Sequence, residues 1–147
     1  MSYSFSRRSL RNLDGVHPDL VAVAHEALRI SDKDFMVIDG LRTIQEQRLL
    51  FEKDKYFGRS QTLKSRHLTG HAIDIVPYPV SWDFDDFYPL GNAFIQACKN
   101  VNVPLRWGGN WQVHDLREWQ GSAEGLVQSY KGTFYDLPHF ELSSRYY

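Results

Sequence analysis

The sequence predicts a single α+β domain in which helices pack on a small, mostly antiparallel sheet. Amphipathic helical patterns alternate with short apolar strand patterns, and no repeat or low-complexity segment interrupts them. A chain of 147 residues suits about one compact domain. Hydrophobic residues make up 42% and charged residues 24%, as in chains that bury a core. We therefore expect residues 1–147 to form one domain.

Helices are expected where apolar residues recur three and four positions apart. The three segments with this pattern are about 17–28, 43–55 and 87–101. At the second of them, Thr43 and Glu46 form the spacing of a capping box. The serine- and arginine-rich segment 6–15 lacks an apolar stripe, so we expect a polar N-terminal arm there.

Strands are expected where short apolar runs end at glycine or proline. The four runs are 35–38, 72–76, 104–107 and 138–142. Gly58 to Lys64 is expected to be a polar loop. Residues 110–133 are expected to form a long irregular connection with one short helical turn, and connections of that length are usually functional.

Charge and cysteine content exclude several classes of function. Seventeen Lys and Arg against eighteen Asp and Glu give a net charge of −1, so we expect no nucleic-acid partner. Cys98 is the only cysteine, which excludes an intramolecular disulfide and a thiol-rich metal site. Its place in a predicted helix favours a core role. Any metal must therefore be held by histidine and carboxylate.

The sequence also bears on targeting. No run approaches the length of about 18 apolar residues that crosses a bilayer, so we expect no stable membrane insertion. Arg7-Arg8 is not followed by the apolar stretch of an export signal. We expect no signal peptide and a product that initially stays in the cytosol.

Two short segments carry residues suited to a metal centre. His67 precedes a glycine turn, and Asp74 lies inside an apolar strand, where an unpaired carboxylate is costly and metal ligation would satisfy it. Asp136 precedes His139 by three residues on the last strand. A zinc hydrolase needs three protein ligands and a nearby carboxylate that transfers protons, and Asp136 suits the second role. Taken singly, each residue would fit an ordinary loop or strand position.

These segments resemble a known enzyme superfamily. Ser65-x-His67-x-x-Gly70-x-Ala72-x-Asp74 and Asp136-x-x-His139 match the two motifs of the D-Ala-D-Ala metallopeptidases of the VanX/VanY type. Asp in the second motif resembles the L-alanyl-D-glutamate peptidases among phage endolysins. Residues 39–43 resemble the G-x-R-[ST] segment of these enzymes, and residues 105–111 resemble their glycine-tryptophan loop. The resemblance therefore covers nearly the full chain. It implies a hedgehog/D,D-peptidase-like fold without a separate cell-wall-binding domain.

The resemblance also implies roles for individual residues. His67, Asp74 and His139 would bind one Zn²⁺, and Asp136 would be the general base and acid. Arg42 would stabilise the oxyanion, a role consistent with its permanent charge and several donors.

Other residues near the motifs are candidates for supporting roles. Ser65 would hydrogen-bond the substrate or the ligand loop. Trp107 and Trp111 lie beside the motifs and are candidates for the substrate groove, within an aromatic content of 14%. His71 is either an alternative ligand, a residue behind the ligands or a solvated loop residue. Glu141 is a second possible base, because it shares a strand face with His139.

The function implied by the resemblance is zinc-dependent cleavage of peptidoglycan stem peptides between L-Ala and D-Glu, for host lysis. The protein would stay in the host cytoplasm until a holin releases it to the periplasmic wall, and would act as a monomer. One alternative is a D,D-carboxypeptidase or dipeptidase acting on D-Ala-D-Ala termini. Another is a non-catalytic, zinc-stabilised binding module, which the presence of Asp136 and Arg42 disfavours.

Overall fold

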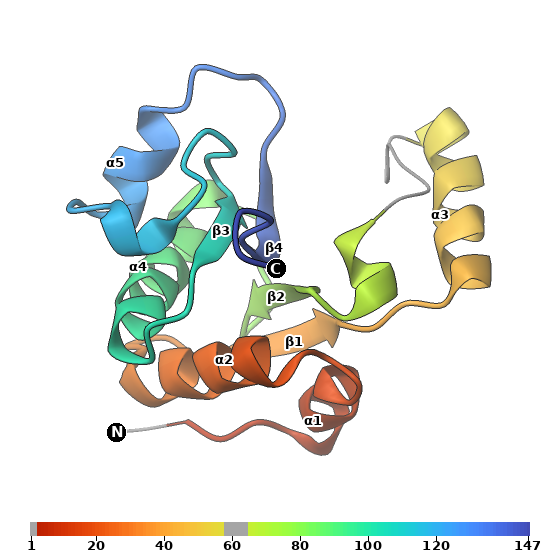
Figure 1. Cartoon of the computed structure of the whole chain (residues 1–147), viewed down its shortest axis with the longest axis horizontal. Helices are drawn as coiled ribbons and strands as arrows, with labels where there is room; N and C mark the ends of the chain where they lie inside the picture. Colours follow the sequence, from red (N-terminus) through yellow and green to blue (C-terminus); the bar gives the residue numbers. More distant parts are fainter. Residues whose placement is uncertain (1–2, 58–64) are drawn as a thin grey trace.

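The computed structural model describes residues 3–57 and 65–147, which form helices around a four-stranded antiparallel sheet (Figure 1). The strand order is β1-β2-β4-β3, and this architecture confirms the predicted α+β class. The elements are α1 (Arg7–Leu13), α2 (Pro18–Ile30), β1 (Phe35–Asp39), α3 (Ile44–Phe57), η1 (Arg66–Thr69), β2 (Ala72–Pro77), α4 (Phe84–Asn100), β3 (Leu105–Gly108), η2 (Leu116–Glu118), α5 (Ala123–Gln128) and β4 (Asp136–Leu142).

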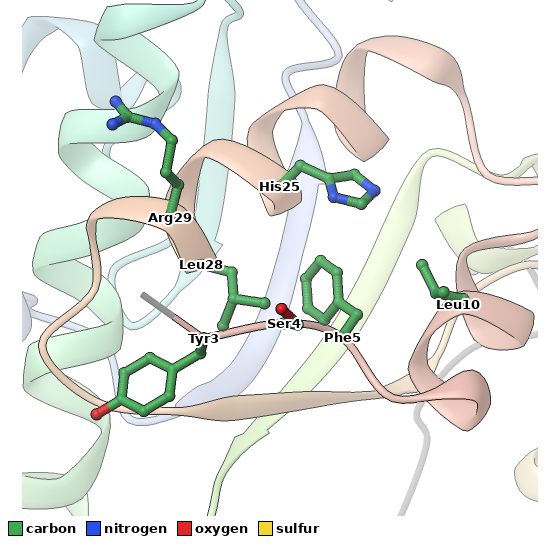
Figure 2. Close-up of a pocket in the computed structure, with 7 residues that line it drawn as sticks. All are labelled: Tyr3, Ser4, Phe5, Leu10, His25, Leu28 and Arg29. Atoms are coloured by element: carbon green, nitrogen blue, oxygen red, sulfur yellow. The ribbon is translucent and has the colours of Figure 1, made fainter. Parts of the chain in front are cut away.

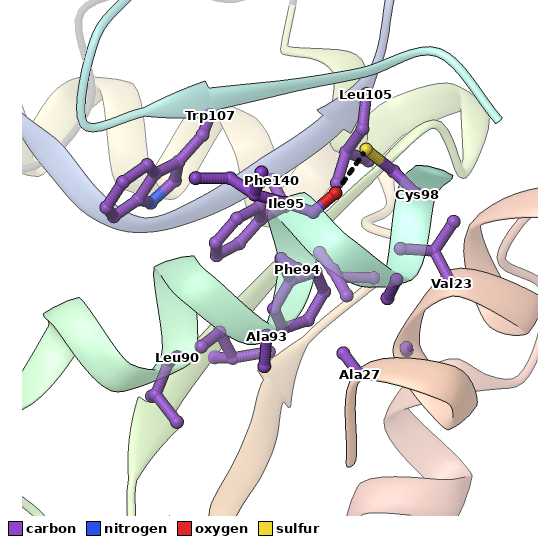
Figure 3. Packing of buried hydrophobic residues seen from close by; sticks show 14 of the residues in the cluster. Val23, Ala27, Leu90, Ala93, Phe94, Ile95, Cys98, Leu105, Trp107 and Phe140 are labelled. Atoms are coloured by element: carbon purple, nitrogen blue, oxygen red, sulfur yellow. Dashed lines mark hydrogen bonds between the residues drawn. The ribbon is translucent and has the colours of Figure 1, made fainter. Parts of the chain in front are cut away.

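The core lies between the sheet and the helices α2 and α4, which pack on one another (Figure 3). Phe94 of α4 stacks on Phe140 of β4 with ring centroids 4.0 Å apart, and Trp107 of β3 stacks on the same ring at 5.4 Å. Cys98 is buried here and donates to the Ile95 carbonyl, and burial raises its pKa to about 12. The thiol is therefore a core group, as predicted.

The N-terminal arm is where the prediction of local structure is wrong. Arg7–Leu13 forms α1, which begins with Ser6 accepting from the Ser9 backbone N–H. The Ser9 hydroxyl in turn accepts from the Val37 N–H, and the Asn12 side-chain amide donates to the Val37 carbonyl. These two hydrogen bonds partner the backbone of Val37 on the free edge of β1. A pattern of apolar residues could not indicate them.

The connection after β3 is more regular than expected. It contains η2 and the helix α5, where one short helical turn was predicted. Leu116, Leu126 and Val127 are buried, and Asn110 donates to the Leu126 carbonyl at 2.9 Å. The segment is therefore packed against the domain.

Two further expectations concern the remaining segments. The predicted polar loop from Gly58 to Lys64 lies outside the described residues. Over the described ranges, no helix combines the length and the apolar character needed to cross a bilayer.

Candidate active site

Two strands and the short helix η1 bring three predicted metal ligands together. Asp74 of β2 pairs directly with His139 of β4, and η1 places His67 beside them. His67 Nε2 and His139 Nδ1 each lie 3.3 Å from Asp74 Oδ1. One potential ligand atom from each residue falls within 4.8 Å of the others. The arrangement is that of three ligands converging on one point.

The remaining motif residues shape the loop that carries His67. Ser65 precedes η1, and its hydroxyl accepts from the His67 backbone N–H at 3.2 Å. Gly70 ends η1 with φ of +71°, and a Cβ there would lie 2.6 Å from the Gly15 carbonyl oxygen. Ser65 is expected to hydrogen-bond either the substrate or the ligand loop, and the structure shows the bond to the ligand loop.

Hydrogen bonds on the outer sides of the two imidazoles set their orientation. His67 Nδ1 donates to the Gly40 carbonyl oxygen at 2.8 Å, which leaves Nε2 facing Asp74. His139 Nε2 lies 2.8 Å from Glu141 Oε1, which leaves Nδ1 facing Asp74. Glu141 shares the face of His139, as expected, and it contacts that ring.

The carboxylate of Asp74 lies between the two imidazoles. Asp74 Oδ1 is buried and has no hydrogen-bond partner, although it touches both imidazoles. Burial alone would raise the pKa of Asp74, but His139 and His67 hold it well below its usual range. Burial alone would lower the pKa of His139, but Asp74 and Glu141 raise it to about 10. A divalent cation would satisfy all three groups at once.

The cluster opens into a cleft of about 490 Å³ that also holds Arg42 and Asp136. We call it the catalytic cleft; its walls are Ile38, Asp39, Arg42, Leu50, Asp74, Trp82, Asp136 and Pro138.

Arg42 is 9% exposed and is fixed at the edge of the cluster. Its guanidinium donates to Asp39 and Gln47 and lies 3.9 Å from Asp74 Oδ2. Its backbone N–H donates to the His67 carbonyl at 2.9 Å. The predicted capping box is confirmed directly after it, because Thr43 and Glu46 exchange hydrogen bonds at the start of α3.

Asp136 begins β4 and also lines the cleft. Burial, and then the charge of Asp74, raise the pKa of its carboxyl. Gly108 allows β3 to approach closely, because a Cβ there would lie 2.1 Å from the Asp136 carbonyl oxygen. The site therefore contains one carboxyl whose pKa is lowered, Asp74, and one whose pKa is raised, Asp136.

The three tryptophans near these motifs have different surroundings. Trp107 is fully buried and donates to the Leu137 carbonyl, so its predicted contact with substrate is wrong. Trp111 lies beside His139, with ring centroids 5.4 Å apart, and its Nε1 has no hydrogen-bond partner. Trp82, which the motifs do not include, lines the catalytic cleft. Only its place between two predicted elements could have drawn attention to it.

His71 does not join the metal cluster. Its Nδ1 lies 2.6 Å from the Thr69 hydroxyl, and its ring lies 5.5 Å from that of His17 and 6.3 Å from that of Tyr147. Burial lowers the pKa of His71, and nearby Arg66 adds to the effect. Of its three possible roles, ligation is not supported by this geometry.

Figure 2 shows a second pocket, of about 350 Å³, between the N-terminal segment and α2. Its three titratable side chains already have partners, since Tyr3 donates to the Asp32 carbonyl, His25 packs edge-on against Phe5 and Arg29 binds Glu26. No residue of the metal cluster reaches it. The candidate catalytic residues therefore line the catalytic cleft and not this second pocket.

Comparison with known proteins gives a consistent result. The family model of the phage L-alanyl-D-glutamate peptidase matches residues 1–143. The L-alanyl-D-glutamate peptidase of Escherichia phage T5 is 34% identical over 146 residues, covering 97% of this chain and 99% of that protein. The corresponding enzyme of Listeria phage A118 is 29% identical over 116 residues, covering 75% of this chain and 38% of that protein.

Solved structures agree with the sequence comparison. The crystal structure of the Serratia marcescens L-Ala D-Glu endopeptidase ChiX matches with a TM-score of 0.74 and 40% identity, covering 97% of this chain and 92% of that one. The chain therefore belongs to the phage L-alanyl-D-glutamate peptidase family.

Proposed function

We propose that this protein is a zinc-dependent endopeptidase that cleaves peptidoglycan stem peptides between L-Ala and D-Glu. The observation that carries the proposal is the buried Asp74 Oδ1, which faces two imidazole nitrogens without a hydrogen bond, in a cleft shared with Asp136. The activity named for the relatives supports the choice of bond.

His67, Asp74 and His139 fit a catalytic zinc site. Two imidazoles and one carboxylate are ligands that zinc accepts, and three protein ligands leave a position for water or substrate. Gly40 and Glu141 orient the two histidines from behind. Bound zinc would supply a Lewis acid that polarises the peptide carbonyl and acidifies water.

Asp136 is the proposed proton carrier. Its carboxylate accepts a proton from the attacking water and delivers it to the nitrogen of D-Glu as the peptide bond breaks. A carboxyl whose pKa is raised is a better base than an ordinary aspartate and holds the proton long enough to transfer it. Glu141, which contacts His139, is better placed to orient that ligand.

Arg42 is the proposed partner of the oxyanion that develops on the scissile carbonyl. Asp39 and Gln47 hold its guanidinium in the cleft, so little reorganisation is needed as charge develops. Trp111, a half-buried ring beside His139, is the proposed substrate contact on that side. Ser65 contributes by holding the His67 backbone.

The proposed biological role is lysis of the bacterial host by a monomeric enzyme. The substrate is the stem peptide, and holin-dependent release from the host cytoplasm would give access to the periplasmic wall. Family membership supports the role in lysis.

Digestion of purified murein, with and without a chelator, tests this function. Mass spectrometry should show whole stem peptides released by the native protein, no release after chelation and recovery on adding Zn²⁺. Release of only terminal D-Ala would identify a D,D-peptidase instead. No hydrolysis by zinc-loaded protein would support a binding module.

Metal content distinguishes the ligands from their neighbours. His67→Ala should lower the zinc content measured by elemental analysis, because one of three ligands is lost. His71→Ala is the matched control and should retain one zinc per chain. Stoichiometric zinc in the first variant would contradict the assignment of His67.

A further inference from the structure

We propose that Trp82 is a substrate-positioning residue that binds a sugar ring of the glycan strand while the stem peptide occupies the catalytic cleft. This inference rests on the proposed function, because it names a second part of the same substrate. It starts from an observation that the catalytic residues do not explain. Trp82 lines the cleft with Arg42, Asp74 and Asp136, yet its side chain is 62% exposed.

The indole has little packing of its own. Among the residues that the structure describes, its aromatic neighbour is Phe87, with ring centroids 6.4 Å apart, whereas tryptophan is usually a highly buried residue. The backbone around it is nevertheless held in place. Ser81 hydrogen-bonds the Asp86 carboxylate, and the Asp83 N–H donates to the Ser81 hydroxyl at 3.3 Å. A large apolar face is thus carried by an ordered stretch of backbone, which lowers the ordering cost of binding a ligand.

The neighbouring residues indicate the chemistry of that ligand. Tyr78, Val80 and Phe84 are also exposed, and Asp83 and Asp85 add negative charge. This surface disfavours the carboxylate-bearing part of the stem peptide beyond the scissile bond. It suits a neutral group with a flat apolar face, such as the C–H face of a pyranose ring.

The chemistry of the substrate places such a group within reach. In peptidoglycan the L-Ala nitrogen is joined through a lactyl group to the muramic acid sugar, whose carboxyl is neutralised by that amide bond. Only one residue separates the scissile carbonyl from this linkage, and one extended residue spans roughly 3.5 Å. With the carbonyl between Asp136 and Arg42, the sugar lies at the edge of the cleft, where Trp82 is exposed.

Kinetics on two matched substrates test the inference. One is the disaccharide-tetrapeptide and the other is the same tetrapeptide without sugar. Trp82→Ala should lower kcat/KM about tenfold on the first, mainly through KM, and change it by less than about twofold on the second. Trp82→Phe should restore most of the loss. Tyr146→Ala, which removes an aromatic ring that is 59% exposed but lies outside the cleft walls, should leave both substrates unaffected.

Equal losses on the two substrates, or no loss on either, would overturn the inference. Binding can also be measured without catalysis, by adding chitobiose to zinc-free protein with ¹⁵N-labelled tryptophan. The indole signal that disappears in Trp82→Phe should shift in the native protein, and a signal that stays in place would contradict sugar binding. Zinc-loaded native protein that cleaves neither substrate would instead refute the proposed function, whatever the result with chitobiose.

Discussion

The two faces of the central strands β2 and β4 differ sharply. On one face, Ile73, Ile75, Phe140 and Leu142 join the core under α2 and α4. On the alternate positions, Asp74 and His139 belong to the proposed metal site, and Glu141 contacts His139. Because side chains alternate along a strand, neighbouring residues serve stability or chemistry. Stability and catalytic chemistry should therefore be separable by single substitutions.

The largest effect is expected for Asp136→Asn, which tests the chemical face alone. Loss of the proton carrier should lower the rate of murein hydrolysis about a thousandfold, as for other general bases. Zinc content and the circular dichroism spectrum should stay unchanged. Asp32→Asn, at an exposed position after α2 and outside the cleft walls, is the control. Activity within tenfold of the native protein would assign proton transfer to another residue.

Phe140→Ala tests the opposite face of the same strand. Removing a fully buried ring that stacks on Phe94 and Trp107 should cost about 3–5 kcal/mol of unfolding free energy, measured by urea denaturation. The folded fraction should still bind zinc in native stoichiometry. A loss of zinc before unfolding would show that the two faces are not separable.

Glu141→Gln is a milder change on the chemical face. An amide can keep a hydrogen bond to His139 Nε2 but removes the negative charge that increases the basicity of the ring. Zinc affinity, measured by competition with a chromophoric chelator, should fall about tenfold. The kcat of the zinc-saturated variant should stay close to native. A kcat as low as that of Asp136→Asn would make Glu141 the base.

The smallest effect concerns the pH dependence of stability in the zinc-free protein. The pKa of Asp136 is higher in the fold than in the unfolded chain, so its ionised form destabilises the fold at neutral pH. Asp136→Asn should therefore raise Tm at pH 7. The gain should diminish as the pH falls through the folded pKa, where the native side chain is protonated as well. A constant gain at all pH values would argue against ionisation as its cause.

Much of the fold could be predicted because its elements depend on local patterns. The capping box at Thr43 and the apolar runs of β1 and β2 require no knowledge of distant residues. The motif spacing likewise anticipated the proximity of His67, Asp74 and His139, since two paired strands and one adjoining turn bring them together.

The wrong predictions share a dependence on distant contacts. α1 forms because Ser9 and Asn12 bond the β1 backbone, 28 and 25 residues further along. Trp107 lies beside a motif in sequence, but the alternation of β3 turns its ring into the core. Trp82 is the opposite case, because only the assembled cleft shows that this linker residue lines the same cleft as Asp136.

The segment joining β1 to α3 meets the ligand loop through two opposed hydrogen bonds. The Gly40 carbonyl accepts from the His67 ring, and the Arg42 N–H donates to the His67 backbone carbonyl. In the proposed mechanism, metal binding by His67 and recognition of the developing negative charge by Arg42 would therefore depend on the same two backbone contacts. By thermodynamic reciprocity, whatever zinc does to the order of Arg42, an anionic transition-state analogue must do to the affinity for zinc. An inhibitor of that kind should slow the loss of the metal to a chelator.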